Sequence, residues 1–185
     1  MSTTAAPPAP RSPGRPAPWK RYGVLALLAV FAAFWTWALF FASKESINRI
    51  GDRDWAARAE QICAEATAER EALADYTRID RATPELIQRR ADIVDAATDI
   101  LSAMLDAVVA VVPDDAKGRE LIPQWERDYR TYLADRRAFA EELRRTGDNL
   151  AFYETASDGI PLSEKVATFA GDNEMPSCAP PRDLS

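Results

Sequence analysis

The longest apolar stretch of the chain is an uncharged run of 20 residues from Gly23 to Ala42. At a rise of about 1.5 Å per residue, a helix of this length spans the roughly 30 Å hydrocarbon core of a bilayer. A cleaved signal peptide is the alternative, but its apolar region is normally roughly 7–15 residues long and ends in small residues. Phe40 stands two residues before Ala42, where a cleavage site needs a small side chain. The pattern therefore predicts an uncleaved transmembrane signal-anchor helix over residues 23–43.

The charges that flank this run predict its orientation. Lys20 and Arg21 adjoin its N-terminal side, and no Asp or Glu precedes it. Because Lys and Arg collect on the cytoplasmic side of membrane helices, we expect a cytoplasmic N-terminus. Residues 1–22 are rich in proline and basic, so we expect a disordered cytoplasmic tail. Spacings such as Pro7 to Pro10 also match the pattern that polyproline-binding domains recognise.

Beyond residue 44, apolar residues recur every three or four positions in three long stretches, which is typical of amphipathic helices. The three expected helices begin at a capping residue or a proline. They run from about Asp52 to Tyr76, from Thr83 to Val112 and from Pro123 to Gly147.

Two shorter segments complete the expected outer domain. Residues 114–122 are expected to form a separate turn or short helix, because Pro123 is placed at the start of the third long helix. Leu162, Val166 and Phe169 predict a short fourth helix that ends near Gly171. No strand pattern is recognised. The fold class is therefore predicted as all-α, with an antiparallel three-helix bundle and a short fourth helix over residues 44–185.

The two cysteines of the chain, Cys63 and Cys178, both lie in the expected outer domain. With three antiparallel helices, the tail after Gly147 returns toward the end of the bundle that holds Cys63, so the topology permits the two thiols to meet. Outside the cytoplasm a disulfide is the default for such a pair. The alternative is two unconnected small hydrophobic residues.

Charge and composition exclude several classes of function. All 29 Asp and Glu residues follow the apolar run while 4 of the 23 Lys and Arg residues precede it, so the outer domain has a net charge of about −10. Such a surface repels nucleic-acid phosphates, and we expect no nucleic-acid partner. The chain also has no histidine, no Cys-x-x-Cys pair and no phosphate-binding glycine motif. We therefore expect no enzyme activity, no metal and no cofactor.

Carboxylates and guanidinium groups recur at helical spacing on the second and third expected helices. The carboxylates share one narrow face, at Asp92, Asp95, Asp99 and Asp106. The arginines step by seven residues with one neighbour, at Arg127, Arg130, Arg137 and Arg144. The aspartates form either a solvated face, a cation site or the acid–base pair of a hydrolase. The arginines pair either with these aspartates or with Asp135 and Glu141 on their own helix, or they bind an acidic ligand.

Four aromatic residues on the third expected helix have two interpretations. They are Trp125, Tyr129, Tyr132 and Phe139. At helical spacing they form either the core of the bundle or a groove for a lipid or another small molecule.

The layout resembles uncharacterised single-pass membrane proteins of actinobacteria that have a Pro-rich basic cytoplasmic tail and a helical outer domain. The residues that carry the resemblance are the segment from Ala42 to Gly51, Asp54-Trp55, Ile62-Cys63 and the segment from Cys178 to Pro181. The resemblance implies location and architecture but no activity. We therefore expect a non-enzymatic cell-envelope protein that binds another envelope protein, with a lipid- or small-molecule-binding bundle as the alternative and a carboxylate-based hydrolase as a third.

Overall fold

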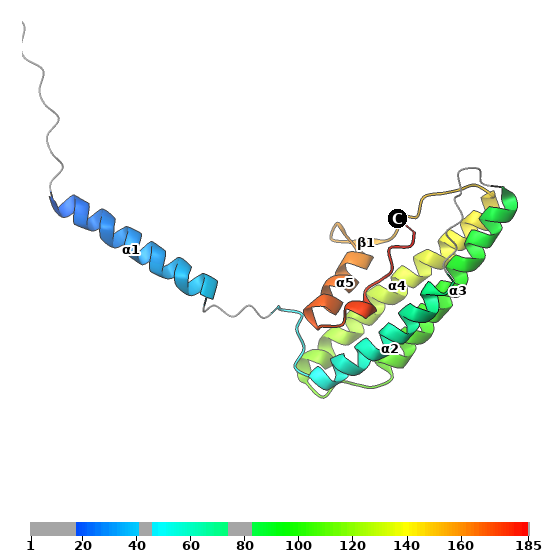
Figure 1. Cartoon of the computed structure of the whole chain (residues 1–185), viewed down its shortest axis with the longest axis horizontal. Coiled ribbons are helices and arrows are strands. Elements are labelled where there is room, and N and C mark those ends of the chain that lie inside the picture. The colour runs from blue at the N-terminus through cyan, green and yellow to red at the C-terminus, as the bar shows by residue number, and fades with distance from the viewer. Residues whose placement is uncertain (1–17, 41–45, 74–82, 185) are drawn as a thin grey trace, which may run out of the picture. The chain divides into compact units, whose positions relative to one another are not determined.

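The computed structural model of the chain describes residues 18–40, 46–73 and 83–184. The chain divides into two compact units, Met1–Glu45 and Ser46–Ser185. The described residues of the first unit form one helix, and those of the second form four α-helices, a short 3-10 helix and a two-stranded hairpin (Figure 1). The expected cytoplasmic tail lies almost entirely outside the described residues.

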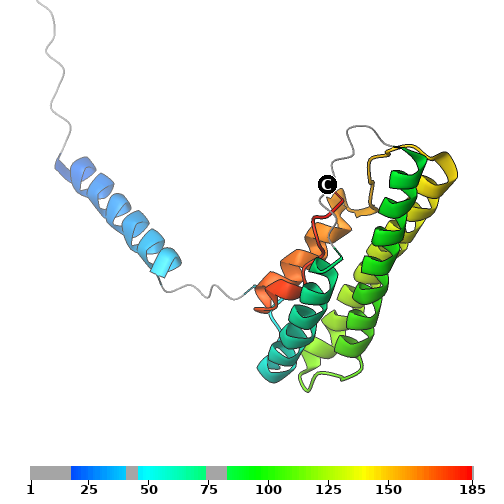
Figure 2. The same cartoon turned by 45° about the vertical axis from the view of Figure 1, so that its right-hand side comes forward.

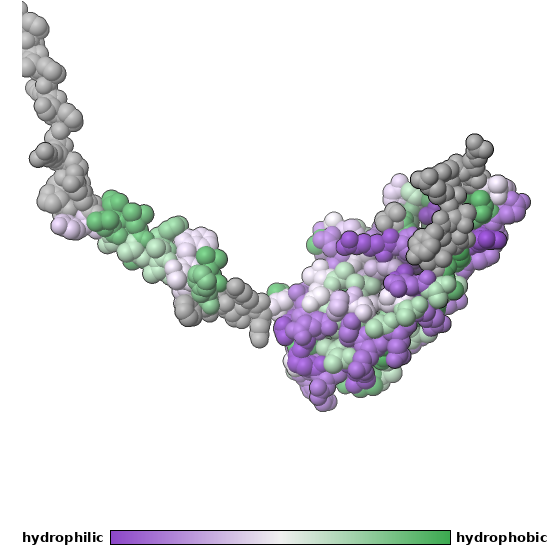
Figure 3. All heavy atoms as spheres, in the orientation of Figure 1, coloured by the Kyte–Doolittle hydropathy of each residue, from purple (hydrophilic) through white to green (hydrophobic). Residues whose placement is uncertain are grey.

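Helix α1, Pro18–Phe40, contains the apolar run. Its segment Tyr22–Phe40 is, among the described residues, the one stretch long and apolar enough to cross a membrane, with a mean hydropathy of 2.1. Its apolar side chains are exposed, which gives α1 the green surface of Figure 3. The helix begins five residues before the expected Gly23, and the expected end at residue 43 lies outside the described residues.

The second unit is built on three long helices whose order and caps follow the sequence pattern. These are α2 (Arg53–Glu71), α3 (Pro84–Val109) and α4 (Ala116–Thr146). Asp52 caps α2 by accepting a hydrogen bond from Trp55 N, and Thr83 caps α3 with proline at its first position. The N-cap residues of α2 and α4 touch each other, so α3 runs antiparallel between them. Figures 1 and 2 show α2, α3 and α4 side by side, which confirms the predicted helical bundle.

Two of the expected helix ends are wrong. Helix α2 ends at Glu71 rather than near Tyr76, which lies outside the described residues. Helix α3 ends at Val109 rather than Val112 because Pro113 has no N–H for the Val109 carbonyl and disfavours helical geometry in the residue before it. The end of α4 at Gly147, with a left-handed φ of 71°, agrees with the prediction.

The largest correction concerns Pro123, which lies inside α4 instead of starting it. The segment expected as a separate turn belongs to this helix, because Asp115 caps its start by accepting from Gly118 N. Gly118 is required there, since a Cβ atom on it would lie 2.6 Å from the Asp115 carboxylate and 2.9 Å from Pro113. Burial of Ile122 and Trp125 on either side of the proline holds the helix together across the missing hydrogen bond.

A short hairpin was also not expected. Its strands are β1 (Ala156–Ser157) and β2 (Ile160–Pro161), paired antiparallel. The turn residues Asp158 and Gly159 have φ values of 56° and 78°. Asp-Gly is a strong local signal for such a two-residue turn, so the signal was present in the sequence.

The predicted fourth helix is α5, Leu162–Asp172, and it packs on α4. The 3-10 helix η1, Pro176–Cys178, follows it and packs on α2. The carboxylate of Glu154 accepts hydrogen bonds from the backbone N–H and hydroxyl of Ser163 and so fixes the start of α5. Asn173, fully buried, ties its end to the first residues of the unit through the Ile50 N–H and the Asn48 carbonyl.

Candidate functional site

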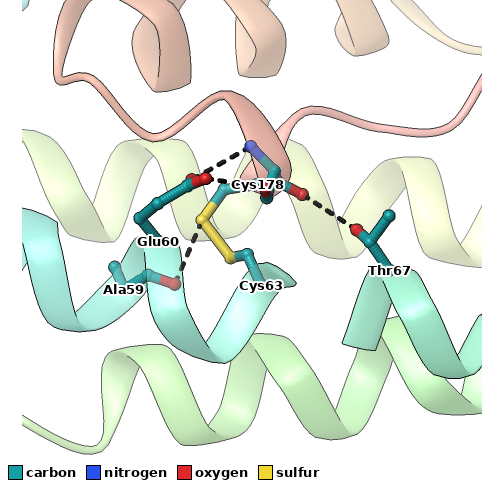
Figure 4. Close-up of a disulfide and its surroundings, with 6 residues drawn as sticks. Ala59, Glu60, Cys63, Thr67 and Cys178 are labelled. Atoms are coloured by element: carbon teal, nitrogen blue, oxygen red, sulfur yellow. Dashed lines mark hydrogen bonds between the residues drawn. A yellow bond between two sulfur atoms is a disulfide. The ribbon is translucent and has the colours of Figure 1, made fainter. Parts of the chain in front are cut away.

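The structure joins Cys63 of α2 to Cys178 of η1 in a disulfide, with 5.0 Å between the Cα atoms (Figure 4). Both residues are fully buried in the main core cluster. Next to the bond, the Glu60 carboxylate accepts from the N–H and the hydroxyl of Ser177, and the Thr67 hydroxyl donates to the Ser177 carbonyl. The pairing expected from topology is therefore present, and it attaches the C-terminal segment to α2.

The aspartate face of α3 meets the arginines of α4. Arg144 contacts both Asp92 and Asp95, at 2.8 and 2.5 Å. One and two helical heptads earlier, Arg137 lies 2.8 Å from Asp99, and Arg130 lies 2.8 Å from Asp106. The hydrogen bond from Arg144 holds the pKa of Asp92 below its ordinary value.

Of the alternatives left open for these groups, pairing between the two helices is the one that the structure contains. The equal seven-residue spacing of the arginines places each one opposite a member of the aspartate face. The carboxylate of Asp135 instead accepts from the N–H and hydroxyl of Thr155. Among the residues that the structure describes, no group of three or more acidic or cysteine side chains is arranged to hold a metal ion. The aspartates thus align α3 with α4.

The four aromatic residues of the possible ligand groove lie in the core. Trp125, Tyr129 and Tyr132 are at most 3% exposed, and Phe139 is 7% exposed. Trp125 and Tyr129 meet edge to face, with ring centroids 5.5 Å apart, and so do Tyr129 and Tyr132 at 6.3 Å. The set therefore packs inside the bundle, although Trp125, Tyr132 and Phe139 each reach the edge of a surface hollow. Ligand binding at these residues stays a prediction.

The polar group that the sequence reading missed is Arg136, which is fully buried within α4. Its guanidinium forms a two-pronged ion pair with the Asp183 carboxylate, at 2.7 and 3.0 Å. It also donates to the Thr98 hydroxyl at 3.0 Å and the Tyr132 hydroxyl at 3.3 Å. Arg70, whose side chain is 17% exposed, approaches the same carboxylate at 4.0 Å. Two guanidinium groups therefore surround one carboxylate.

The buried location shapes the electrostatics of this cluster. Burial acts to lower the pKa of Arg136, but its hydrogen bond and charge interaction with Asp183 outweigh burial and leave that pKa raised. Burial also raises the pKa of the Tyr129 and Tyr132 phenols, so both stay neutral. Among the residues that the structure describes, the Tyr129 hydroxyl and the Nε of Arg70 are buried without a hydrogen-bond partner.

A signal for this cluster was present in the sequence. Arg136 follows Tyr132 by four residues and precedes Phe139 by three, so it occupies a position on the apolar stripe of α4. A charged residue at such a position is expected to be paired when it is buried. Its partner, Asp183, lies 47 residues away in a segment without helical periodicity, and no local pattern connects the two.

Three hollows open on one side of the second unit, each bounded by α4 and residues 150–169. One, of about 630 Å³, lies between α5 and the C-terminal residues 180–184. Another, of about 330 Å³, is lined by Trp125 and Phe169, and a third, of about 610 Å³, includes Phe139 and Tyr153. Tyr153 is 87% exposed at the rim of the third.

The chain matches no model of a known protein family, no curated protein and no solved structure.

Proposed function

We propose that the protein is a non-enzymatic module of the cell envelope. Helix α1 anchors it in the plasma membrane with the N-terminus in the cytoplasm, and the second unit lies outside and binds another envelope protein. The length and hydropathy of α1 support the anchor, and the unopposed Lys20 and Arg21 support the orientation. The disulfide is consistent with an oxidising compartment outside the cytoplasm.

The observation that carries the binding proposal is a group of three hollows that share one boundary and have exposed apolar side chains beside them. All three hollows are bounded by α4 and residues 150–169, and this same segment exposes Tyr153 and Ile160. Tyrosine is enriched among the residues that dominate protein interfaces, because it combines a large apolar area with a polar tip. On α3, by contrast, the exposed aspartates are occupied by the arginines of α4. The partner is therefore expected at the α4–α5 side.

Site-specific photo-cross-linking in intact cells tests this surface. A photoreactive amino acid replaces Tyr153, and in a control variant it replaces Ala107, which is exposed on α3. We expect one envelope protein to be captured at position 153 and not at position 107. Identical products at both positions, or no protein product at either, would contradict the proposal.

Two separate measurements test the anchor and the orientation. Alkaline carbonate washing is expected to leave the protein in the membrane fraction, and its release would contradict an integral span. A membrane-impermeant amine reagent applied to intact cells is expected to label Lys117, which is exposed on α4, and to leave Lys20 unlabelled. Labelling of Lys20 alone would reverse the proposed orientation.

A second candidate function is binding of a lipid or small molecule, and the hollow beside Trp125 favours it. Its volume of about 330 Å³ lies at the lower end of the range for ligand sites, roughly 300–1,000 Å³. Its lining joins the apolar Trp125, Val166 and Phe169 to the ion pair between Lys165 and Asp128. If cross-linking captures no protein, mass spectrometry of small molecules extracted from the purified protein tests this candidate, and an empty extract would count against it.

A further inference from the structure

The C-terminal strap, residues 179–184, lies on the surface and is held at a few points. Its N-terminal end is fixed covalently because it follows Cys178 directly. Beyond the disulfide, the Tyr132 hydroxyl donates to the Pro181 carbonyl at 3.2 Å, and Asp183 forms its ion pair with Arg136. Leu184 packs, partly buried, against the smaller core cluster. The strap therefore resembles a short peptide bound to a folded domain, and its anchors are a carboxylate and a neighbouring leucine that lie in a turn.

The site beneath the strap has the chemistry of a carboxylate receptor. Arg136 presents its guanidinium in the two-pronged geometry that matches a carboxylate, and Thr98 and Tyr132 hold that group in place. Arg70 adds a second positive charge, so the two cations exceed the single anion of Asp183. Within the described part of the chain, the Tyr129 hydroxyl is buried nearby without a partner. The two arginines and one aspartate thus carry a net positive charge, and the Tyr129 hydroxyl beside them lacks a hydrogen-bond partner among the described residues.

The strap also separates this cluster from open space. The hollow of about 630 Å³ is lined on one side by α5 and on the other by residues 180–182 and Leu184. Tyr132 borders this hollow and also donates to the strap and contacts Arg136. Displacement of the strap would join the hollow to the buried guanidinium, which gives an entering peptide a continuous path.

We propose that Arg136 and Arg70 form a binding site for an acidic segment of the partner protein, and that the strap is its exchangeable intramolecular occupant. The proposal rests on the proposed function and names the chemistry of its partner: an Asp or Glu carboxylate next to an aliphatic side chain. Asp183 and Leu184 show the occupied form of the site.

Covalent attachment gives the strap a strong advantage over a free segment. Short tethers produce effective concentrations in the millimolar range, so a free peptide must compete with an occupant that is always present. A competing peptide binds only those molecules in which the strap has left the site. Its apparent affinity is therefore its intrinsic affinity multiplied by the fraction of molecules in which the site is open. Removal of the Asp183 charge weakens the occupant without altering the receptor groups, and so raises the affinity for an external carboxylate.

The test uses the full chain in detergent and a fluorescent peptide with the sequence of residues 179–185, Ala-Pro-Pro-Arg-Asp-Leu-Ser. Fluorescence anisotropy measures its binding to the unaltered protein, to Asp183→Asn and to Asp158→Asn, in which the same change is made at the exposed hairpin turn. We expect Asp183→Asn to bind this peptide about tenfold more tightly than the other two proteins, since a charged hydrogen bond carries an effect of about that size. A second peptide, with Asn in place of Asp, is expected to bind Asp183→Asn about tenfold more weakly than the first.

A folded Asp183→Asn protein that binds neither peptide, or binds both equally, would overturn the proposal. If that variant does not fold, hydrogen exchange on the unaltered protein decides the question. Excess Asp-containing peptide is expected to speed exchange at the strap amides, and the Asn-containing peptide is not. Unchanged exchange with both peptides would overturn the site. A partner still captured at position 153 would then leave the proposed function standing with its contact elsewhere.

Discussion

The disulfide between Cys63 and Cys178 is expected to supply a large share of the stability of the second unit. The perturbation is the double variant Cys63→Ala with Cys178→Ala, compared with the unaltered protein under oxidising conditions. The two cysteines are separated by 115 residues. In the chain-entropy treatment, a cross-link over a loop of this length removes about 5 kcal/mol of conformational freedom from the unfolded state. That is a large fraction of the roughly 5–15 kcal/mol by which folded domains are stable.

The assay is urea unfolding in detergent, followed by the fluorescence of Trp55 and Trp125, which are buried in the main core cluster. Domains of this size lose roughly 1–3 kcal/mol of stability per molar urea, so a loss of about 5 kcal/mol is expected to lower the unfolding midpoint by about 2–5 M. Reductant should produce a comparable fall in the unaltered protein and no change in the double variant, which serves as the control. A shift equivalent to less than about 1 kcal/mol would refute the view that the bond restricts the unfolded chain.

Three further results are expected. Gly118→Ala should lower the free energy of unfolding by about 2 kcal/mol, because the new Cβ atom would lie 2.6 Å from a carboxylate oxygen of Asp115. Gly171→Ala should raise the free energy of unfolding by about 0.5–1 kcal/mol, because a Cβ atom there meets no atom of the described residues within 4 Å outside its own helix and alanine favours the helix. Thermal unfolding of the two variants compares these effects. Asp183→Asn should cost about 1–3 kcal/mol in urea unfolding, less than for a fully buried pair because the Asp183 side chain is 30% exposed. The thermal midpoint should stay constant from about pH 5 to pH 8, since the chain has no histidine. At pH values below about 4 the thermal midpoint should decrease. The hydrogen bond from Arg144 lowers the pKa of Asp92 in the folded state. The stability that this ionised carboxylate contributes is present above its unfolded-state pKa and is lost as the pH falls through its folded-state pKa. Each expectation is contradicted by a change of the opposite sign, and the last also by a midpoint that drops between pH 5 and pH 8.

Local signals predicted the helices well where one residue type had one structural role. Asp52 and Thr83 cap helices as their side chains suggest, and Gly147 ends α4 in the left-handed geometry that glycine favours. Pro123 misled because proline both starts helices and interrupts them. The choice is decided by what lies before it, where Asp115 had already capped the helix. The N-cap residue Asp115 therefore decides where this helix begins, and the proline eight residues later does not.

The candidate sites were harder to predict because their polar groups depend on contacts between distant segments. The aspartates and arginines of α3 and α4 could each be assigned to a face, but their pairing required the relative position of the two helices. The disulfide was accessible because two cysteines allow one pairing. The contact between Arg136 and Asp183 could not be predicted in either way. Asp183 lies outside any periodic segment, so it could not be assigned to a helix face, and the chain offers many other acidic residues as partners for Arg136.

A comparison of the two sets of arginines shows which charges merit functional attention in this protein. Arg137 and Arg144 are exposed by 45% and 31%, and ion pairs at that exposure contribute roughly 0–1 kcal/mol each, so their heptad repeat chiefly sets the alignment of two helices. Arg136 is completely buried, and an ion there without a partner would cost several kcal/mol. A chain that places such a group under a short surface strap makes its stability depend on whatever carboxylate occupies the site. That dependence makes the site selective, because only a segment with a correctly placed carboxylate can replace Asp183 without leaving the guanidinium unpaired.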